Sequence, residues 1–196
     1  MGNCIKLAIT GGIGCGKSVV SHIMSVMGVP VYDCDSRAKE IMTTDASIVK
    51  ALKRMFGDSC YNDDGSLNRP FLASRIFTND NNIERVNALV HPAVKKDFER
   101  WAAAKECPVV AVETAVLYES GMIEAVDKVL VVWADKETAI RRTMKRSGMS
   151  RNQVFSRMQK QVATDDLLLL TDYSIYNDGN SPLLPEVIEL LDELKG

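Results

Sequence analysis

One glycine-rich segment constrains this chain more than any other feature: residues 11–18 read GGIGCGKS and match the pattern G-x-x-x-x-G-K-[ST] at every specified position. An apolar run precedes the segment and hydrophobic residues at helical spacing follow it, so it joins a predicted strand to a predicted helix. Glycines let backbone N–H groups turn inward around a phosphate chain, and the start of the helix adds the positive end of its dipole. Lys17 can then reach the outer phosphates, and the Ser18 hydroxyl can ligate Mg²⁺. The segment therefore predicts a nucleoside triphosphate site, whereas an ordinary glycine-rich turn would not explain the lysine and the hydroxyl.

Length and composition restrict what can surround this site. The chain has 196 residues and is 46% hydrophobic, which is enough for one α/β core with insertions and too little for two catalytic domains. Its net charge of -2 provides no general attraction to nucleic acid or to an anionic membrane. The five cysteines are scattered, which is typical of reduced thiols in a cytoplasmic protein, and no apolar stretch approaches about 20 residues. We therefore expect neither a signal peptide nor a membrane span, and no nucleic-acid partner.

Short β-rich runs alternate with helical patterns along the chain. The runs cover residues 5–10, 29–32, 109–112, 129–133 and 173–176. Nearly continuous apolar strands separated by helices are typical of a parallel sheet that is covered on both faces. The ligand of such a sheet lies at the carboxyl ends of the strands, which is also where the glycine-rich segment begins. The predicted fold is therefore α/β, with a parallel five-stranded sheet flanked by helices.

Two stretches are longer or more charged than a simple crossover requires. We assign residues 36–105 to a helical substrate-binding insertion and residues 141–163, which are rich in arginine and lysine, to a lid. Half of the basic residues of the lid would only solvate an exposed helix. The nucleotide-binding core then comprises residues 1–35, 106–140 and 164–196.

Local signals divide these two insertions into helices. Asp45 can cap a helix that ends at Gly57, and the His91-Pro92 step is predicted to interrupt the last helical pattern of the first insertion. Ser150 and Gln153 have the spacing of a capping box, so the lid is predicted to be a helical hairpin.

Two carboxylates follow the second predicted strand. Asp33 and Asp35 lie on the same side of the chain as long as it stays extended. One of them can hold Mg²⁺, and the other can orient an attacking hydroxyl and accept its proton. Asp35 is alternatively the N-cap of the next helix, a role that is compatible with catalysis. No N-K-x-D segment is present to recognise guanine, so the predicted nucleotide is ATP.

The motifs of this chain together resemble those of the dephospho-coenzyme A kinase family, whose members use ATP to phosphorylate the ribose 3′-hydroxyl of dephospho-coenzyme A. The resemblance follows the order of the family's motifs through residues 7–18, Asp33-Cys34-Asp35, Arg75-Ile76-Phe77, residues 89–92, residues 117–121, residues 141–146 and residues 172–179. It implies a P-loop kinase core, a coenzyme-binding insertion, a lid, and cofactor use of ATP with Mg²⁺.

The resemblance also implies roles for single residues. Asp35 is implied as the base and Asp33 as the carboxylate nearer the metal, although the assignment within the pair stays open. Arg142 and Arg146 are implied to approach ATP from the lid, and Asn177 to lie near adenine. The catalytic set is then Asp35, Lys17, Asp33 and Arg142; the nucleotide-binding set Gly12, Ile13, Gly14, Cys15, Gly16, Lys17, Ser18, Val19, Arg146 and Asn177; the metal set Ser18 and Asp33; and the substrate set Asp35, Arg75 and His91.

Two single residues allow more than one interpretation. His91 is either a structural residue at a helix boundary or a contact to the substrate. Cys15 stands near a helix N-terminus and beside Lys17, so we expect its pKa to be lowered, which would make it a redox brake on ATP binding. The alternative is a tolerated small residue that is shielded from oxidants.

Two other functions share parts of this pattern. A nucleoside or nucleotide kinase would have the same core and lid, and an ATP-gated binding protein would bind nucleotide without transferring phosphate. The paired aspartates and the large insertion argue against the second. The sequence gives no indication of oligomeric state.

Overall fold

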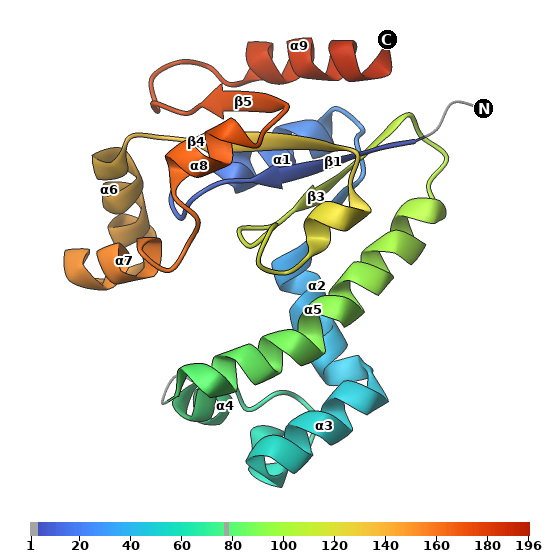
Figure 1. Cartoon of the computed structure of the whole chain (residues 1–196), viewed down its shortest axis with the longest axis vertical. Coiled ribbons are helices and arrows are strands. Elements are labelled where there is room, and N and C mark those ends of the chain that lie inside the picture. The colour runs from blue at the N-terminus through green and yellow to red at the C-terminus, as the bar shows by residue number, and fades with distance from the viewer. Residues whose placement is uncertain (1–3, 77–78) are drawn as a thin grey trace.

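The computed structural model describes residues 4–76 and 79–196, and these form an α/β fold around one five-stranded sheet (Figure 1). All strands run parallel, in the order β2-β3-β1-β4-β5. The strands are β1 (Ile5–Thr10), β2 (Val31–Asp33), β3 (Val109–Glu113), β4 (Lys128–Trp133) and β5 (Tyr173–Tyr176). The five predicted strands are therefore confirmed, with ends that differ by one or two residues.

Helices connect the strands and cover the sheet. The α-helices are α1 (Lys17–Val26), α2 (Cys34–Thr44), α3 (Ala46–Phe56), α4 (Arg69–Ile76), α5 (Asp80–Ala103), α6 (Lys136–Ser147), α7 (Arg151–Met158), α8 (Thr164–Leu169) and α9 (Leu184–Lys195). Two short 3-10 helices are η1 (Asp58–Cys60) and η2 (Met122–Ala125). Among the described residues, no helix combines the length and the hydrophobicity that crossing a bilayer requires.

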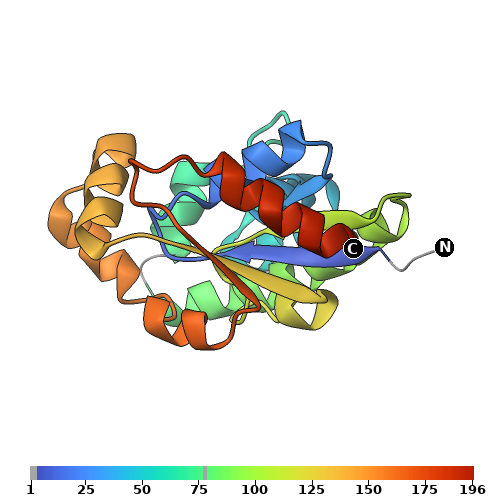
Figure 2. The ribbon, with the colours of Figure 1, turned by 90° about the horizontal axis from the view of Figure 1, so that it is seen from above.

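The sheet has an apolar core on each face, because alternate residues of a buried strand point to opposite sides. Leu7 and Ile9 of β1 pack with α1 and α9, which lie together over one face (Figure 2). Ala8 of the same strand belongs to the core on the other face, which also contains side chains of α5, η2 and α8. The sheet is thus covered on both faces, and the carboxyl ends of its strands are where a parallel sheet of this kind binds its ligand.

The first insertion forms a helical unit below the sheet in Figure 1, made of α2, α3, α4 and most of α5. Asp45 caps α3 as predicted, since its side chain accepts hydrogen bonds from the backbone N–H groups of Ser47 and Ile48. Gly57 ends the helix, as predicted. A turn follows at Asp64-Gly65, where the Asp64 side chain accepts from the backbone N–H of Ser66.

The predicted interruption at His91-Pro92 is wrong, because α5 continues from Asp80 to Ala103 with Pro92 inside it. Proline cannot donate a backbone hydrogen bond and normally ends or kinks a helix. Here a stripe of buried residues at intervals of four continues through the proline: Val86, Val90, Val94, Phe98 and Ala102. Burial of one face therefore keeps both halves of α5 in a single helix.

The second insertion is the predicted helical hairpin of α6 and α7, seen at the left of Figure 1. Gly148 ends α6 with a φ of 68°, and Ser150 and Gln153 form the predicted capping box at the start of α7. The hairpin starts within the core, because α6 is one helix from Lys136 onward. The division into a core, an insertion and a lid stays a prediction. Phe77, part of one family motif, lies outside the described residues.

Candidate active site

The glycine-rich segment forms a loop between β1 and α1, and two of its positions have room only for glycine. Gly11 has a φ of 141°, and a Cβ atom there would lie 2.0 Å from the carbonyl oxygen of Val132. Gly16 has a φ of 100°, and a Cβ atom there would lie 2.1 Å from the side-chain nitrogen of Asn177. The Nζ atom of Lys17 folds back over the loop and donates to the carbonyl oxygens of Gly11 at 2.9 Å and Gly12 at 3.1 Å. The lysine is therefore held next to the backbone N–H groups that would surround a phosphate.

A pocket of about 650 Å³ opens in front of this loop. It lies between the loop, the start of α2, the end of β3, the α6–α7 hairpin and the segment after α7. Its predicted site residues are Ile13, Gly14, Gly16, Lys17, Ser18, Val19, Asp33, Asp35, Arg142 and Arg146. Arg157, one of the basic residues within 141–163, also lines it, as do residues that the sequence did not single out: Lys39, Glu113, Thr114, Ala115 and Gln161.

The two aspartates share this pocket, but for a different reason than predicted. The chain is not extended through them, since β2 ends at Asp33 and α2 begins at Cys34. Asp33, rather than Asp35, is the N-cap of α2, and its Oδ1 atom accepts from the N–H groups of Asp35 at 3.0 Å and Ser36 at 3.4 Å. Its Oδ2 atom accepts from the Ser36 hydroxyl at 2.5 Å. Both oxygens of Asp33 are thus engaged, whereas no described residue donates a hydrogen bond to the exposed carboxylate of Asp35.

Glu113 and Lys39 are the charged residues of the pocket that sequence reasoning missed. Glu113 ends β3 directly opposite Asp33, with which it is in register. Burial raises the pKa of the Glu113 carboxyl above its ordinary value; the charge of Lys17 opposes this shift and that of Asp33 adds to it. Glu113 could have been found in the sequence as a carboxylate at the end of an apolar strand. Lys39 could have been found by its helical spacing, because it follows Asp35 by one turn of α2.

Asn177 lies behind the loop rather than in the pocket, where it joins two other segments. The residue is 6% exposed, and its side-chain nitrogen donates to the carbonyl oxygen of Cys15 at 2.9 Å. Arg142 of α6 donates to the backbone oxygen and to the side-chain oxygen of Asn177, each at 3.1 Å. The phosphate loop, the lid and the loop after β5 are therefore tied together by one buried amide.

Gln161 connects the lid to the opposite side of the phosphate loop. Its Oε1 atom accepts a hydrogen bond of 2.9 Å from the backbone N–H of Ile13. This N–H belongs to the part of the loop that is expected to bind phosphate. The side chain therefore holds a donor that a phosphate oxygen could use.

The expectation of a reactive Cys15 is wrong. Its side chain is only 2% exposed, and burial raises the pKa of the thiol above its ordinary value, although Lys17 acts in the opposite direction. A buried neutral thiol is a poor nucleophile and is shielded from oxidants. Cys15 is therefore a small packing residue of the loop.

Arg75 and His91 do not line this pocket. Arg75 is exposed on α4, with its guanidinium carbon 5.1 Å from the centre of the Phe71 ring. His91 is half-buried within α5, and burial lowers its pKa although the charge of Glu119 opposes the shift. The contacts of both residues with a substrate stay predictions.

The oxygen atoms around the pocket fit a hard divalent cation. Ser18 contributes a hydroxyl, and Asp33, Asp35 and Glu113 contribute carboxylates. Among residues 4–76 and 79–196, no three acidic, cysteine or histidine side chains are close enough together to enclose a metal ion. Mg²⁺ is usually held by one or two carboxylates together with phosphate oxygens and water.

Comparison with known proteins gives one family. The family model described as dephospho-CoA kinase matches residues 5–182. A dephospho-CoA kinase of Bacteroides fragilis strain YCH46 is 39% identical over 188 residues, which cover 95% of this chain and 91% of the relative. The crystal structure of TT1252 from Thermus thermophilus has a TM-score of 0.84 at 31% identity and covers 99% of this chain and 100% of that one. A dephospho-CoA kinase from Campylobacter jejuni shares the fold with a TM-score of 0.73 at 24% identity, covering 97% of this chain and 96% of that one. With a family model that matches nearly its whole length and a relative this similar, the chain belongs to the dephospho-CoA kinase family.

Proposed function

We propose that this protein transfers the γ-phosphoryl group of ATP to the ribose 3′-hydroxyl of dephospho-coenzyme A, giving coenzyme A and ADP, the last step of coenzyme A biosynthesis. The observation that carries the proposal is one pocket shared by a phosphate loop, its lysine and the carboxylate of Asp35, which accepts no hydrogen bond from any described residue. Membership of the family supports the choice of substrates. Family membership and the predicted absence of a membrane span support a cytoplasmic location.

The phosphate loop would bind the triphosphate through its backbone. The N–H groups of residues 12–19 and the start of α1 supply partial positive charge, and Lys17 supplies a full one. On binding, Lys17 would exchange the carbonyl oxygens of Gly11 and Gly12 for phosphate oxygens. Mg²⁺, when bound beside Ser18 and Asp33, would neutralise charge that develops on the phosphates.

Asp35 would act as the base for the acceptor hydroxyl. Its carboxylate has no hydrogen-bond donor among the described residues, so it is free to accept the hydroxyl proton. Asp33 is already occupied by the start of α2, which suits a carboxylate with a fixed orientation next to a metal. The geometry thus favours the assignment that the family resemblance implies.

The lid would complete the site. Arg142 and Arg146 line the pocket from α6, and with Arg157 of α7 they bring positive charge to the side where the triphosphate enters. Phosphoryl transfer needs alignment, neutralisation of charge and exclusion of water, all of which a closed basic lid supplies. Arg75 and His91 would contact the coenzyme outside this pocket.

The reaction is tested by identifying its product. The protein is incubated with Mg-ATP and dephospho-coenzyme A, and the product is characterised by mass and by the position of the new phosphate. Nucleosides and nucleoside monophosphates serve as competing acceptors. Preferred phosphorylation of one of these would favour a nucleoside or nucleotide kinase, and ATP-dependent binding of a partner without any phosphorylated acceptor would favour an ATP-gated binding protein.

Removing the charge of Asp35 tests its role. We expect Asp35→Asn to lower kcat by a factor of about 100 or more, because a positioned general base contributes about 100-fold to 10,000-fold. Folding should be unchanged, since the side chain is exposed. Steady-state kinetics and thermal unfolding measure the two effects, with Asp63→Asn, an exposed aspartate of the insertion, as the matched control. Turnover like that of the wild type would exclude Asp35 as an essential base.

A further inference from the structure

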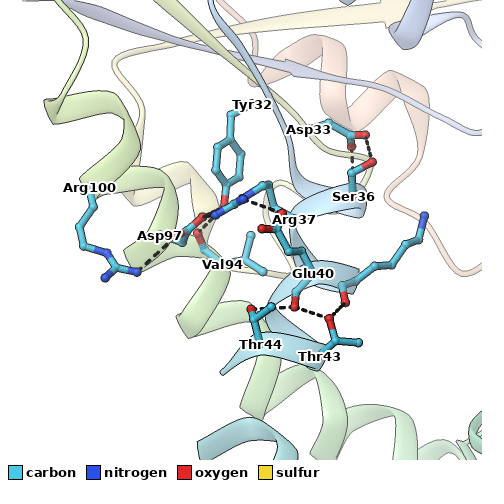
Figure 3. A network of polar contacts seen from close by, with 11 residues as sticks. Tyr32, Asp33, Ser36, Arg37, Glu40, Thr43, Thr44, Val94, Asp97 and Arg100 are labelled. Carbon is cyan, nitrogen blue, oxygen red and sulfur yellow. Dashed lines mark hydrogen bonds and ion pairs between the residues drawn. The ribbon is translucent and has the colours of Figure 1, made fainter. Parts of the chain in front are cut away.

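A half-buried polar network lies just outside the pocket, where α5 passes the start of α2 (Figure 3). At its centre is Asp97 of α5. Its Oδ2 atom accepts from the Tyr32 hydroxyl at 2.8 Å and from the Nε and Nη2 atoms of Arg37 at 3.0 and 2.7 Å. Its Oδ1 atom accepts from Arg100 at 3.2 Å. One carboxylate of the insertion thus binds the end of β2 and the first turns of α2 together.

Two donors of this network, Tyr32 and Arg37, flank the turn that carries Asp33 and Asp35. Tyr32 directly precedes Asp33 in β2, and Arg37 follows Asp35 by two residues in α2. Neither side chain lines the pocket. The network therefore holds the turn that carries both aspartates without touching the reacting groups.

The sheet alone holds this turn weakly. β2 has three residues and lies at the edge of the sheet, so it pairs with β3 on one side only. On one face of the sheet the Tyr32 ring, 2% exposed, packs edge-on against two rings of α5, with centroids at 5.3 Å for Phe98 and 5.4 Å for Trp101. The direction of the turn is thus set jointly by β3 and by α5.

Stability alone does not account for a carboxylate at this position. The Asp97 side chain is 14% exposed, and burying an ion pair is often no more stabilising than packing apolar residues of similar size. Burial raises the pKa of Asp97, but the hydrogen bonds from Arg37 and Tyr32 outweigh this and leave the pKa below its ordinary value. Hydrogen bonds to a charged carboxylate depend on direction, whereas apolar contacts do not. These hydrogen bonds can therefore fix the orientation of the turn that carries the two aspartates.

We propose that Asp97 is a positioning residue of the phosphoryl transfer: through Tyr32 and Arg37 it fixes the turn that presents Asp33 and Asp35 to the phosphate loop. The inference rests on the role proposed above for Asp35. By this inference α5, a helix of the coenzyme-binding insertion, helps to align the two catalytic carboxylates.

The test removes single polar groups of the network and separates turnover from nucleotide binding. Tyr32→Phe deletes the hydroxyl, which donates to Asp97 at 2.8 Å and also lies 3.3 Å from the carbonyl oxygen of Val94. Asp97→Asn removes the charge at nearly constant size. Both should lower kcat by about 10-fold to 100-fold, because displacement of a reacting group by about 1 Å has effects of this order. The Kd of ATP should stay unchanged in both variants, since the phosphate loop is not touched.

Tyr61→Phe is the matched control. The Tyr61 hydroxyl also donates a half-buried hydrogen bond, at 2.6 Å to the carbonyl oxygen of Met42. This bond ties the far end of α2 to the rest of the insertion. Tyr61→Phe should keep the kcat of the wild type, as should Arg100→Ala, which removes only the exposed partner of Asp97.

The possible outcomes separate this inference from the roles on which it rests. A loss of kcat in Tyr32→Phe and Asp97→Asn, with unchanged ATP affinity and an active Tyr61→Phe, supports the inference. It is overturned if both variants turn over like the wild type while Asp35→Asn is inactive, or if Tyr61→Phe loses as much kcat as Tyr32→Phe. Full activity of Asp35→Asn would instead refute the role of Asp35, and the positioning inference with it.

Discussion

The carboxylate of Glu113 is held in the pocket at the expense of folding stability. It ends β3 opposite Asp33, where burial is the largest cause that raises its pKa. A raised pKa of an acid means that the folded state disfavours the charged form. The unfavourable contribution is therefore absent below the ordinary pKa of a glutamate and appears as the pH rises through the raised value. The negative charge of Glu113 beside the phosphate loop therefore lowers the free energy of unfolding. A bound Mg²⁺ ion would offset this loss of stability.

Neutralising Glu113 should therefore stabilise the nucleotide-free protein. We expect Glu113→Gln to raise the Tm at pH 8 and to leave it unchanged at about pH 4, where the wild-type side chain is largely protonated in both states. Thermal unfolding between these pH values, without nucleotide or Mg²⁺, measures the difference. Equal Tm values for both proteins at pH 8 would contradict the inferred penalty. Glu186→Gln, on α9 and away from the pocket, is the control.

At the scale of secondary-structure elements, the segment after α7 interacts directly with the phosphate loop. Gln161 accepts from the Ile13 N–H and lines the same pocket as Lys17. If ATP phosphates use this N–H, Gln161 must first release it. The link between lid and loop would then compete with nucleotide binding in the free protein.

Removing this competitor should strengthen ATP binding. We expect Gln161→Ala to lower the Kd of ATP by about five-fold, because an intramolecular hydrogen bond contributes about 1 kcal/mol net. Isothermal titration calorimetry measures the affinity, with Gln159→Ala, an exposed neighbour, as the control. A higher Kd would show instead that Gln161 contacts the bound nucleotide.

At the scale of the whole molecule, the site depends on segments that are distant in sequence. Asn177 and Cys15 are 162 residues apart, and Arg142 is 35 residues from Asn177, yet the three meet behind the phosphate loop. The position of β5 beside β4 at the edge of the sheet brings the Asn177 loop there. One side chain thus relates the loop, the lid helix and the last strand to one another.

Truncating Asn177 should disturb both folding and nucleotide binding. We expect Asn177→Ala to lower the free energy of unfolding by about 1–3 kcal/mol, because it removes partners of a buried carbonyl oxygen and of the half-buried Arg142 guanidinium. The Kd of ATP should rise, since the loop and the lid lose their common support. Urea unfolding and calorimetry measure the two effects. The control Asn180→Ala, which truncates an exposed amide of the same loop, should change neither the free energy of unfolding nor the Kd of ATP. Wild-type values of both quantities in Asn177→Ala would contradict the supporting role of Asn177.

The sequence by itself determined the features that are encoded over a few neighbouring residues. The phosphate loop, the five strands, the caps at Asp45 and Ser150 and the acidic pair after β2 depend on local backbone chemistry and on hydrophobic periodicity, which can be read along the chain. Local patterns failed where burial decided instead. Packing carried α5 through Pro92, and it raised the pKa of Cys15 that its neighbours alone would have lowered.

Only the tertiary structure decided the order of the strands and, with it, what surrounds the loop. Strand order brings Glu113 opposite Asp33 and Asn177 behind Cys15, and the path of α5 brings Asp97 to Tyr32. Such contacts join residues many positions apart, and their formation depends on which surfaces can be buried together rather than on any one segment. The chemistry of the site is therefore visible in short motifs, whereas its alignment is a property of the folded chain.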